Sequence, residues 1–301
     1  MNGIINIYKE QGFTSFDVVA KLRGICHQKK IGHTGTLDPD ATGVLPVCLG
    51  NATKLCDLLM DKDKEYEAVL LLGVTTDTQD TSGTVIKERE VNVSEADVIS
   101  CIQKYIGEIE QIPPMYSALK VNGKKLYELA RAAVEVERKP RKITIMNIEV
   151  VNIELPRVTM KVTCSKGTYI RTLCNDIGES LGCGGTMEKL TRTRVGIFTL
   201  QNACKLSELQ MLADEEKVES RLISVDALFM MDDKLRVKPE SDKYLYNGNP
   251  FHKRDVDVIE QVMDACATEC STNVCVTSEC MNEKNISLHN MGITYEDICS
   301  N

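Results

Sequence analysis

Two long β-forming segments run in succession between Ile143 and about Cys164, and the second one constrains the fold most. In that segment the apolar residues Val158, Met160, Val162 and Cys164 alternate with Thr and Lys. Alternation with a period of two is typical of a strand with one buried face. A helix predicted over residues 168–181 follows, and a glycine ends it. The chain therefore builds a sheet that has a buried face.

Strands and helices occur elsewhere in the chain without a regular β-α-β order. Further strands are predicted near residues 3–8, 66–74, 84–87 and 186–200, and helices near 16–26, 52–60, 94–106, 126–133 and 205–221. Residues 32–50 show neither the apolar period of a helix nor the alternation of a strand. They are expected to form a loop pressed against the core. This order favours the α+β class, with a mixed, mostly antiparallel central sheet flanked by helices and loops.

The length of the chain and the distribution of its charge limit its domain organisation and its possible binding partners. The chain has 301 residues and a formal net charge of −8, yet residues 201–301 alone carry 10 Lys and Arg against 19 Asp and Glu. The first 200 residues are nearly neutral, so a polyanionic partner is not excluded. With no long apolar run and no export signal, we expect a cytoplasmic protein that does not bind membranes. Beyond about residue 230 the sequence becomes polar and Cys-rich, with few large apolar residues. This change in composition predicts a large domain over 1–230 and a small appendage over 231–301.

Thirteen cysteines are expected to be reduced thiols, since no export signal is visible. Four of them, Cys266, Cys270, Cys275 and Cys280, crowd the tail at separations that differ from the paired C-x₂-C spacing of common zinc sites. No metal site is predicted there. A thiol or metal protein defined by this tail remains an alternative.

The segment 32–43 is the densest in unusual residues, with three glycines, a proline, two acids and a histidine. Asp38 precedes Pro39, which forces an extended backbone and holds the carboxylate away from any helix. Such a carboxylate suits a nucleophile, a general base or a metal ligand. An aspartate making local turn hydrogen bonds is an equally good interpretation of the spacing alone.

Arg171 lies three residues into the helix predicted from Thr168. Its guanidinium is placed to reach a carboxylate on a neighbouring loop and to hold it ionised, although a surface arginine is the commoner outcome.

A basic region covers residues 120–142, with eight Lys and Arg against three Glu. Such a surplus suits a phosphate backbone, but charge runs are more often solvated faces.

Four blocks in order resemble the tRNA pseudouridine-55 synthases of the TruB type. They read GHTGTLDPDATGVLPVCLGNATK (32–54), DKEYEAVLLLGVTTDTQDTSG (63–83), QIPPMYSALKVNGKKLYELAR (111–131) and CSKGTYIRTLCNDIGESLGCGGTMEKLTRTRVG (164–196). The resemblance covers residues 1–200 continuously and thins toward 250. It implies the pseudouridine synthase fold and the isomerisation of one T-loop uridine of tRNA to pseudouridine, by base flipping and without a cofactor.

The resemblance also implies roles for individual residues. Asp38 matches the essential aspartate, Tyr66 the active-site tyrosine that stacks on the flipped base, and Arg171 the partner of the carboxylate. The sequence leaves open whether Asp38 attacks C1′ or assists a glycal-type route. The residues expected to contact substrate or RNA are His33, Lys64, Tyr169, Leu190, Lys120, Lys124, Lys125, Arg131 and Arg141.

The C-terminal segment departs from the family pattern. Residues 235–250 resemble the opening of an RNA-binding PUA domain, and residues 251–301 then diverge into an acidic, Cys-rich sequence. We expect a monomer that binds the tRNA T-stem-loop and needs no protein partner. The alternatives are a guide-dependent relative that works with partner proteins on ribosomal RNA, and a catalytically silent tRNA-binding or RNA-folding protein on this scaffold.

Overall fold

A computed structural model describes residues 1–121, 123–132, 134–229, 233–241, 243, 255–260 and 274–276. The chain divides into two compact units. One consists of Ile5–Cys48 and Thr53–Arg221, and the other of Met1–Ile4, Leu49–Ala52 and the chain from Leu222 onward. The first unit contains the proposed site.

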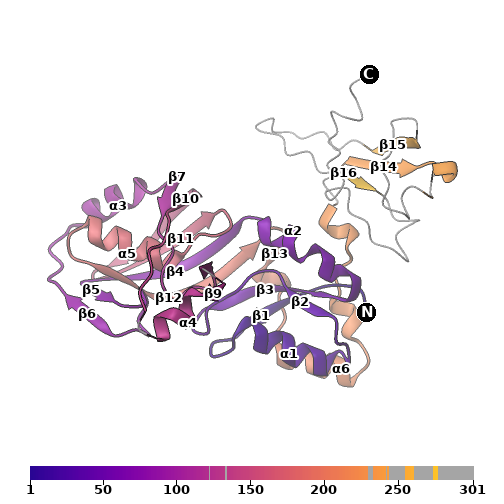
Figure 1. The fold of residues 1–301 in the computed structure, drawn as a ribbon, viewed down its shortest axis with the longest axis horizontal. Coiled ribbons are helices and arrows are strands. Elements are labelled where there is room, and N and C mark those ends of the chain that lie inside the picture. Colours follow the sequence, from indigo (N-terminus) through magenta and orange to yellow (C-terminus); the bar gives the residue numbers. More distant parts are fainter. Residues whose placement is uncertain are drawn as a thin grey trace. The chain divides into compact units, whose positions relative to one another are not determined.

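A nine-stranded mixed sheet forms the centre of the larger unit (Figure 1). Its main path runs in the order β1-β3-β12-β4-β11-β10-β7, with β2 paired to β3 and β13 paired to β12. The strands are β1 (Gly3–Lys9), β2 (Ile31–His33), β3 (Thr42–Leu49), β4 (Lys64–Leu72), β7 (Gly107–Gln111), β10 (Arg141–Glu154), β11 (Arg157–Cys164), β12 (Gly185–Val195) and β13 (Phe198–Thr199). Two hairpins lie outside this sheet, formed by β5 (Val74–Thr76) with β6 (Val85–Glu88) and by β8 (Lys120–Val121) with β9 (Lys124–Lys125).

Helices cover this sheet and confirm the predicted α+β class. They are α1 (Ser15–Ile25), α2 (Cys56–Asp61), α3 (Glu95–Gln103), α4 (Leu126–Arg131), α5 (Ile170–Ser180) and α6 (Leu206–Asp214). Helix α5 packs against β4 and β12, and α3 packs against β10. The β4, β7, β10, β11 and β12 ladder is antiparallel, whereas β12 pairs with β3 in parallel. The prediction of a mixed, mostly antiparallel sheet is therefore correct.

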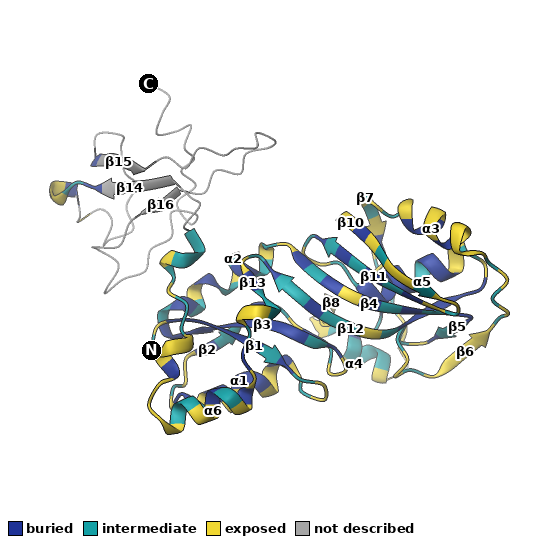
Figure 2. Cartoon of the chain, turned by 180° about the vertical axis from the view of Figure 1, so that it is seen from behind, coloured by how far each residue is buried: buried dark blue, intermediate teal, exposed yellow. Residues whose placement is uncertain are grey.

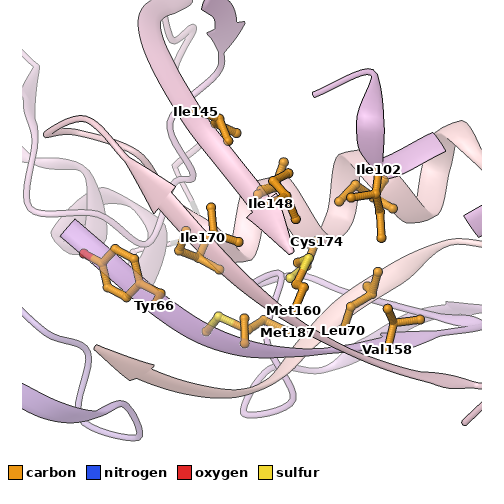
Figure 3. Packing of buried hydrophobic residues seen from close by; sticks show 14 of the residues in the cluster. Tyr66, Leu70, Ile102, Ile145, Ile148, Val158, Met160, Ile170, Cys174 and Met187 are labelled. Carbon is orange, nitrogen blue, oxygen red and sulfur yellow. The ribbon is translucent and has the colours of Figure 1, made fainter. Parts of the chain in front are cut away.

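The alternation in β11 places its apolar side chains in the core, as the sequence predicts. Val158, Met160, Val162 and Cys164 are all fully buried. They join a cluster contributed by β4, β10, α3 and α5, part of which is shown in Figure 3. Burial is concentrated on the central strands, whereas β6 is exposed along its whole length (Figure 2). This core fixes the ends of β4, β12 and α5, where the proposed site residues lie.

Local capping fixes where two helices begin. Thr14 accepts a hydrogen bond from the backbone N–H of Asp17, whose carboxylate accepts one from the Thr14 N–H, so α1 starts with a capping box. Ser94 and Asp97 form the same arrangement at the start of α3. Each cap satisfies backbone N–H groups that a helix start leaves without partners.

The prediction of a loop over residues 32–50 is wrong for the second half of that segment. Thr42–Leu49 forms β3, an inner strand of the large sheet. Seven of its eight residues are buried. A strand buried on both faces has a continuous apolar run rather than an alternating one, so periodicity does not reveal it. The expectation that this segment presses against the core is confirmed.

The smaller unit contains a three-stranded sheet in the order β15-β14-β16. Its strands are β14 (Asp233–Val237), β15 (Val256–Glu260) and β16 (Val274–Val276). Strand β14 pairs antiparallel with β15 and parallel with β16. Residues 251–301, where the sequence departs from the family pattern, contain β15 and β16. Four of the five tail cysteines and the segment 244–250 lie outside the described residues.

The eight cysteines between Cys26 and Cys204 are free thiols. Seven of them are buried and serve as small core residues, whereas Cys56 is half-buried. Among the residues that the structure describes, no helix is long and apolar enough to span a membrane.

Candidate active site

The glycine-rich segment between β2 and β3 is a tightly fixed loop that carries Asp38. Thr34 donates to the Pro46 carbonyl through its backbone N–H at 3.2 Å and its hydroxyl at 3.1 Å, and the Leu37 N–H donates to the Ser15 hydroxyl at 2.9 Å. Gly43 has φ +108°, and a Cβ there would lie 2.2 Å from the Arg192 carbonyl oxygen. Only glycine fits a backbone so close to β12, so this residue sets the path by which the loop returns to the sheet.

Two buried cationic side chains stabilise the Asp38 loop by hydrogen bonds to its backbone carbonyl oxygens and to those of neighbouring residues. The Lys9 ammonium donates to the carbonyl oxygens of Phe13 at 2.6 Å and Pro39 at 3.0 Å. The Arg192 guanidinium donates to the carbonyl oxygens of Val44 at 2.7 Å and Thr36 at 3.5 Å. Burial lowers the pKa of Lys9 to about 8. Sequence reasoning missed both residues, although a lysine that ends the apolar strand GIINIYK is a signal for a buried one.

Arg171 joins the Asp38 loop to a second carboxylate. Its Nη2 lies 3.1 Å from Asp38 Oδ2, and its Nη1 lies 3.4 Å from Asp80 Oδ2. The exposed side-chain fractions are 8% for Arg171, 16% for Asp80 and 38% for Asp38. The guanidinium is thus buried between two acids, and only Asp38 remains substantially open to solvent. This is the arginine–aspartate contact that the sequence predicts.

Asp80 is a site residue that sequence reasoning missed. Its Oδ1 accepts hydrogen bonds from the Thr78 hydroxyl at 2.7 Å and from the Ser82 N–H at 3.1 Å, which leaves Oδ2 directed at Arg171. The segment 76–83 reads as a turn, and turn aspartates usually bond only locally. Nothing in the local sequence indicates that one oxygen reaches a helix about 90 residues further on.

Burial raises the pKa of Asp38 above the ordinary aspartate value. The Arg171 guanidinium opposes this shift, and the negative charge of Asp80 adds to it. Arginine pairing therefore reduces the cost of an ionised Asp38 without cancelling the effect of desolvation.

The raised pKa predicts an acid limb in the rate profile. If ionised Asp38 is required, turnover falls as pH decreases through its pKa, and we expect the midpoint above the ~3.9 of an unperturbed aspartate. Single-turnover rates measured between pH 4 and 8 would locate this midpoint, with circular dichroism at each pH to confirm folding. A rate that stays constant down to pH 4 in folded protein would contradict the prediction.

Tyr66 lies on β4 at the edge of the core, with its hydroxyl pointing away from the other labelled side chains (Figure 3). It is 8% exposed and pairs across the ladder with Arg192. Burial raises the pKa of Tyr66, and the nearby positive charge of Arg192 partly offsets that rise. The hydroxyl is therefore protonated at neutral pH.

His33, on β2, is half-buried, and its Nδ1 accepts a hydrogen bond from the Gly35 N–H at 3.4 Å. Burial and the Arg192 charge lower the pKa of His33, so the imidazole is neutral at physiological pH. Leu190, on β12, packs partly buried against the core cluster. Tyr169 is half-buried immediately before α5, and burial raises the pKa of its phenol.

Lys64 is not presented to a phosphate, in contrast to the expectation from the sequence. The residue is 7% exposed, and its ammonium donates to the carbonyl oxygens of Met60 and Lys62 at the end of α2. Carbonyl groups at a helix C-terminus have no intrahelical partners and attract cations, and here they take up the lysine. Burial lowers the pKa of Lys64 to about 8.

The predicted basic residues gather partly on one hairpin. The β8–β9 pairing places Lys120 opposite Lys125, and Lys124 lies next to Lys125 on β9. The Lys125 ammonium and the Arg131 guanidinium lie 5.3 Å and 5.5 Å from the centre of the Tyr127 ring. Arg141 lies on β10 opposite Gln111 and is exposed.

Known families and structures match this sequence and fold. The N-terminal domain of the TruB family pseudouridylate synthases matches residues 23–170, and the C-terminal domain of tRNA pseudouridylate synthase B matches residues 171–230. A chain from the crystal structure of a Cbf5–Nop10–Gar1 complex is 30% identical with a TM-score of 0.68, over 84% of this chain and 69% of that one. The sequence and the fold are thus those of a pseudouridylate synthase.

Curated proteins with similar sequences identify the family of this chain. The tRNA pseudouridine synthase B of Lachnoclostridium phytofermentans is 58% identical over 257 residues, which is 83% of this chain and 84% of that protein. The protein of the same name from Clostridium kluyveri is 52% identical over 248 residues, or 82% of this chain and 84% of that protein. The chain belongs to the TruB family of pseudouridylate synthases.

Proposed function

We propose that this enzyme converts the T-loop uridine at position 55 of tRNA to pseudouridine. The observation that carries the proposal is the half-open Asp38 carboxylate, paired with buried Arg171 on a loop that two further buried cations fix. The relatives named tRNA pseudouridine synthase B supply the substrate class. Residues 1–230 are proposed to carry the reaction, in the cytoplasm, and 231–301 to form a divergent PUA-like appendage.

The isomerisation breaks the bond between N1 and C1′ and forms one between C5 and C1′. The C5 proton is lost to solvent and N1 gains a proton, so the product has the same atoms as the substrate and requires no group donor. Asp38 is proposed to supply the negative charge that acts at the ribose, either by attack on C1′ or by assisting a glycal-type route. The target base lies in the RNA stack, so it must first be flipped out.

The neighbouring residues are assigned by their environments. Arg171 and Asp80 orient Asp38, and Tyr66 stacks on the everted base with its protonated hydroxyl available for proton transfer. Neutral His33 is proposed to fill the space that the base leaves, and Leu190 to form an apolar wall. Tyr169 is proposed to contact the nucleoside from the start of α5.

Tritium release tests this function. Purified enzyme is mixed with unmodified tRNA that contains [5-³H]uridine, because forming the C5–C1′ bond expels the label into water. We expect stoichiometric release from the intact tRNA and none from a transcript with cytidine at position 55. Binding of this tRNA without release would instead support a silent RNA-binding protein. Activity of the purified chain alone would also support the proposal that it needs no protein partner.

Changing Lys120, Lys124 and Lys125 together to Ala is expected to weaken tRNA binding and to reduce its salt dependence. All three lie on the β8–β9 hairpin, so they are placed to contact one stretch of phosphates. Each lost phosphate contact reduces the slope of log Kd against log salt by roughly 1. Fluorescence titrations at several salt concentrations would measure this slope.

A charge-matched control uses exposed lysines from other elements, changed to Ala together: Lys87, Lys104 and Lys205. Their removal is expected to leave the slope within experimental error of the wild-type value. Equal slopes for the two triple variants would show that the hairpin does not contact phosphates.

A further inference from the structure

The start of α5 positions Arg171 but lacks the usual side-chain cap. Tyr169 is the N-cap residue, with φ −100° and ψ 106°, and its own side chain makes no capping hydrogen bond. Its carbonyl oxygen accepts the first intrahelical bond, from the Leu173 N–H at 3.1 Å. A helix start of this kind needs partners from elsewhere in the chain to fix its direction.

Gln111 supplies two of these partners. Its Oε1 accepts a hydrogen bond from the Tyr169 N–H at 2.8 Å, and its Nε2 donates to the Tyr169 carbonyl oxygen at 3.1 Å. Both ends of one side-chain amide thus bind both polar groups of one backbone residue. Gln111 is 2% exposed and ends strand β7, where its backbone pairs with Arg141 of β10. The amide is therefore fixed by the sheet before it fixes the helix.

Two site side chains depend on this backbone. Tyr169 is itself a proposed nucleoside contact, and Arg171 follows two residues later with its guanidinium between Asp38 and Asp80. The contacts of that guanidinium are 3.1 Å and 3.4 Å long, so the longer one is already at the limit of a hydrogen bond. A small displacement of the first turn of α5 would break the bridge between the two carboxylates.

We propose that Gln111 is a positioning residue for the isomerisation, whose amide holds the Tyr169 backbone so that Arg171 reaches both Asp38 and Asp80. This inference rests on the proposed function. Gln111 need not touch the substrate, because its effect passes through Arg171. It therefore changes the rate of the chemical step and the ionisation of Asp38 more than the affinity for tRNA.

The test compares Gln111→Met and Gln111→Glu with the wild type, using tritium release under single-turnover conditions. Methionine keeps the volume of the side chain but forms neither bond, whereas glutamate keeps the acceptor and replaces the donor by an oxygen. We expect kcat to fall about 10- to 100-fold in both variants, as a displacement of about 1 Å in a positioned group can produce. The KM for tRNA should stay within about twofold. The acid limb of the rate should move to higher pH, because Asp38 loses part of its pairing with Arg171.

Asn202→Leu is the matched control, because Asn202 also bridges backbone groups by its amide. Its Oδ1 accepts from the Thr199 N–H at 3.0 Å, and its Nδ2 donates to the Ile197 carbonyl at 3.4 Å, on a segment that bears no proposed site residue. This variant is expected to lose stability while keeping the rate and the acid limb of the wild type.

These outcomes distinguish a failure of the proposed function from a failure of the positioning role. An inactive wild type would overturn the proposed function itself. An active wild type with Gln111 variants that keep the wild-type rate and acid limb would overturn the positioning role alone. A rate loss that matches that of Asn202→Leu, with an unmoved acid limb, would also overturn it, since it would reflect stability only. If Gln111→Met fails to fold, Gln111→Glu decides the question, because it keeps a polar side chain of equal length.

Discussion

Asp38→Asn is expected to abolish tritium release while leaving the fold and tRNA binding intact. The substitution keeps the shape of the side chain and removes the charge that the reaction requires, so we expect a loss of at least about 10⁴-fold in kcat. The backbone of the loop depends on Lys9, Arg192 and Gly43 rather than on the carboxylate, so the unfolding midpoint should change by only about 3 °C.

The neighbouring Asp40 provides the control for this substitution. It lies on the same loop and is exposed, so Asp40→Asn removes one negative charge from the same region without touching Arg171. We expect this variant to retain wild-type turnover and affinity. Equal tritium release by the Asp38 and Asp40 variants would refute the assignment of Asp38 as the reacting carboxylate.

Arg171→Met is expected to reduce kcat by about 10²- to 10³-fold and to lower stability as well. Without the guanidinium, the negative charge of Asp80 acts on Asp38 with no arginine to oppose it, and the pKa of Asp38 rises further. Breaking a buried ion pair by removing one partner costs about 3–5 kcal/mol, and the partial exposure of Asp38 places the expected loss below that range. Urea unfolding and single-turnover release would measure the two effects separately.

Arg171→Lys separates charge from geometry. A lysine ammonium is a point charge that cannot bridge two carboxylates as a guanidinium does, so the variant should regain stability more than rate. Arg157→Met is the control, because Arg157 binds Glu188 at 2.8 Å through a 53%-exposed side chain. We expect that loss to change neither the rate nor, by more than about 1 kcal/mol, the stability. An Arg171→Met variant with wild-type turnover would contradict the proposed orientation of Asp38.

The sequence predicts the parts of this fold whose signals are local. The alternation in β11, the helix predicted near residue 94 and the closing strands after residue 185 are all confirmed, because each depends on neighbours in the chain. Strand β3 was missed because burial on both faces removes the alternation on which the prediction relied.

The candidate site divides in the same way. The contact between Arg171 and Asp38 was predicted, with family resemblance supplying the pairing that spacing alone left open. Asp80 and Lys9 were missed, since their partners come from distant segments that only the folded chain brings together. The expectation for Lys64 failed because the end of α2 lies next to it and binds its ammonium. The catalytic roles of these residues remain predictions.

The clamped Asp38 loop has a consequence for how the enzyme uses RNA binding. Because Lys9 and Arg192 bind its carbonyl oxygens within the folded protein, the loop is preorganised before any RNA arrives. No conformational entropy has to be lost at this loop on encounter with tRNA. The free energy of contact with the RNA is then available for unstacking and everting the nucleotide, which is the costly part of reaching a base inside a folded T-loop.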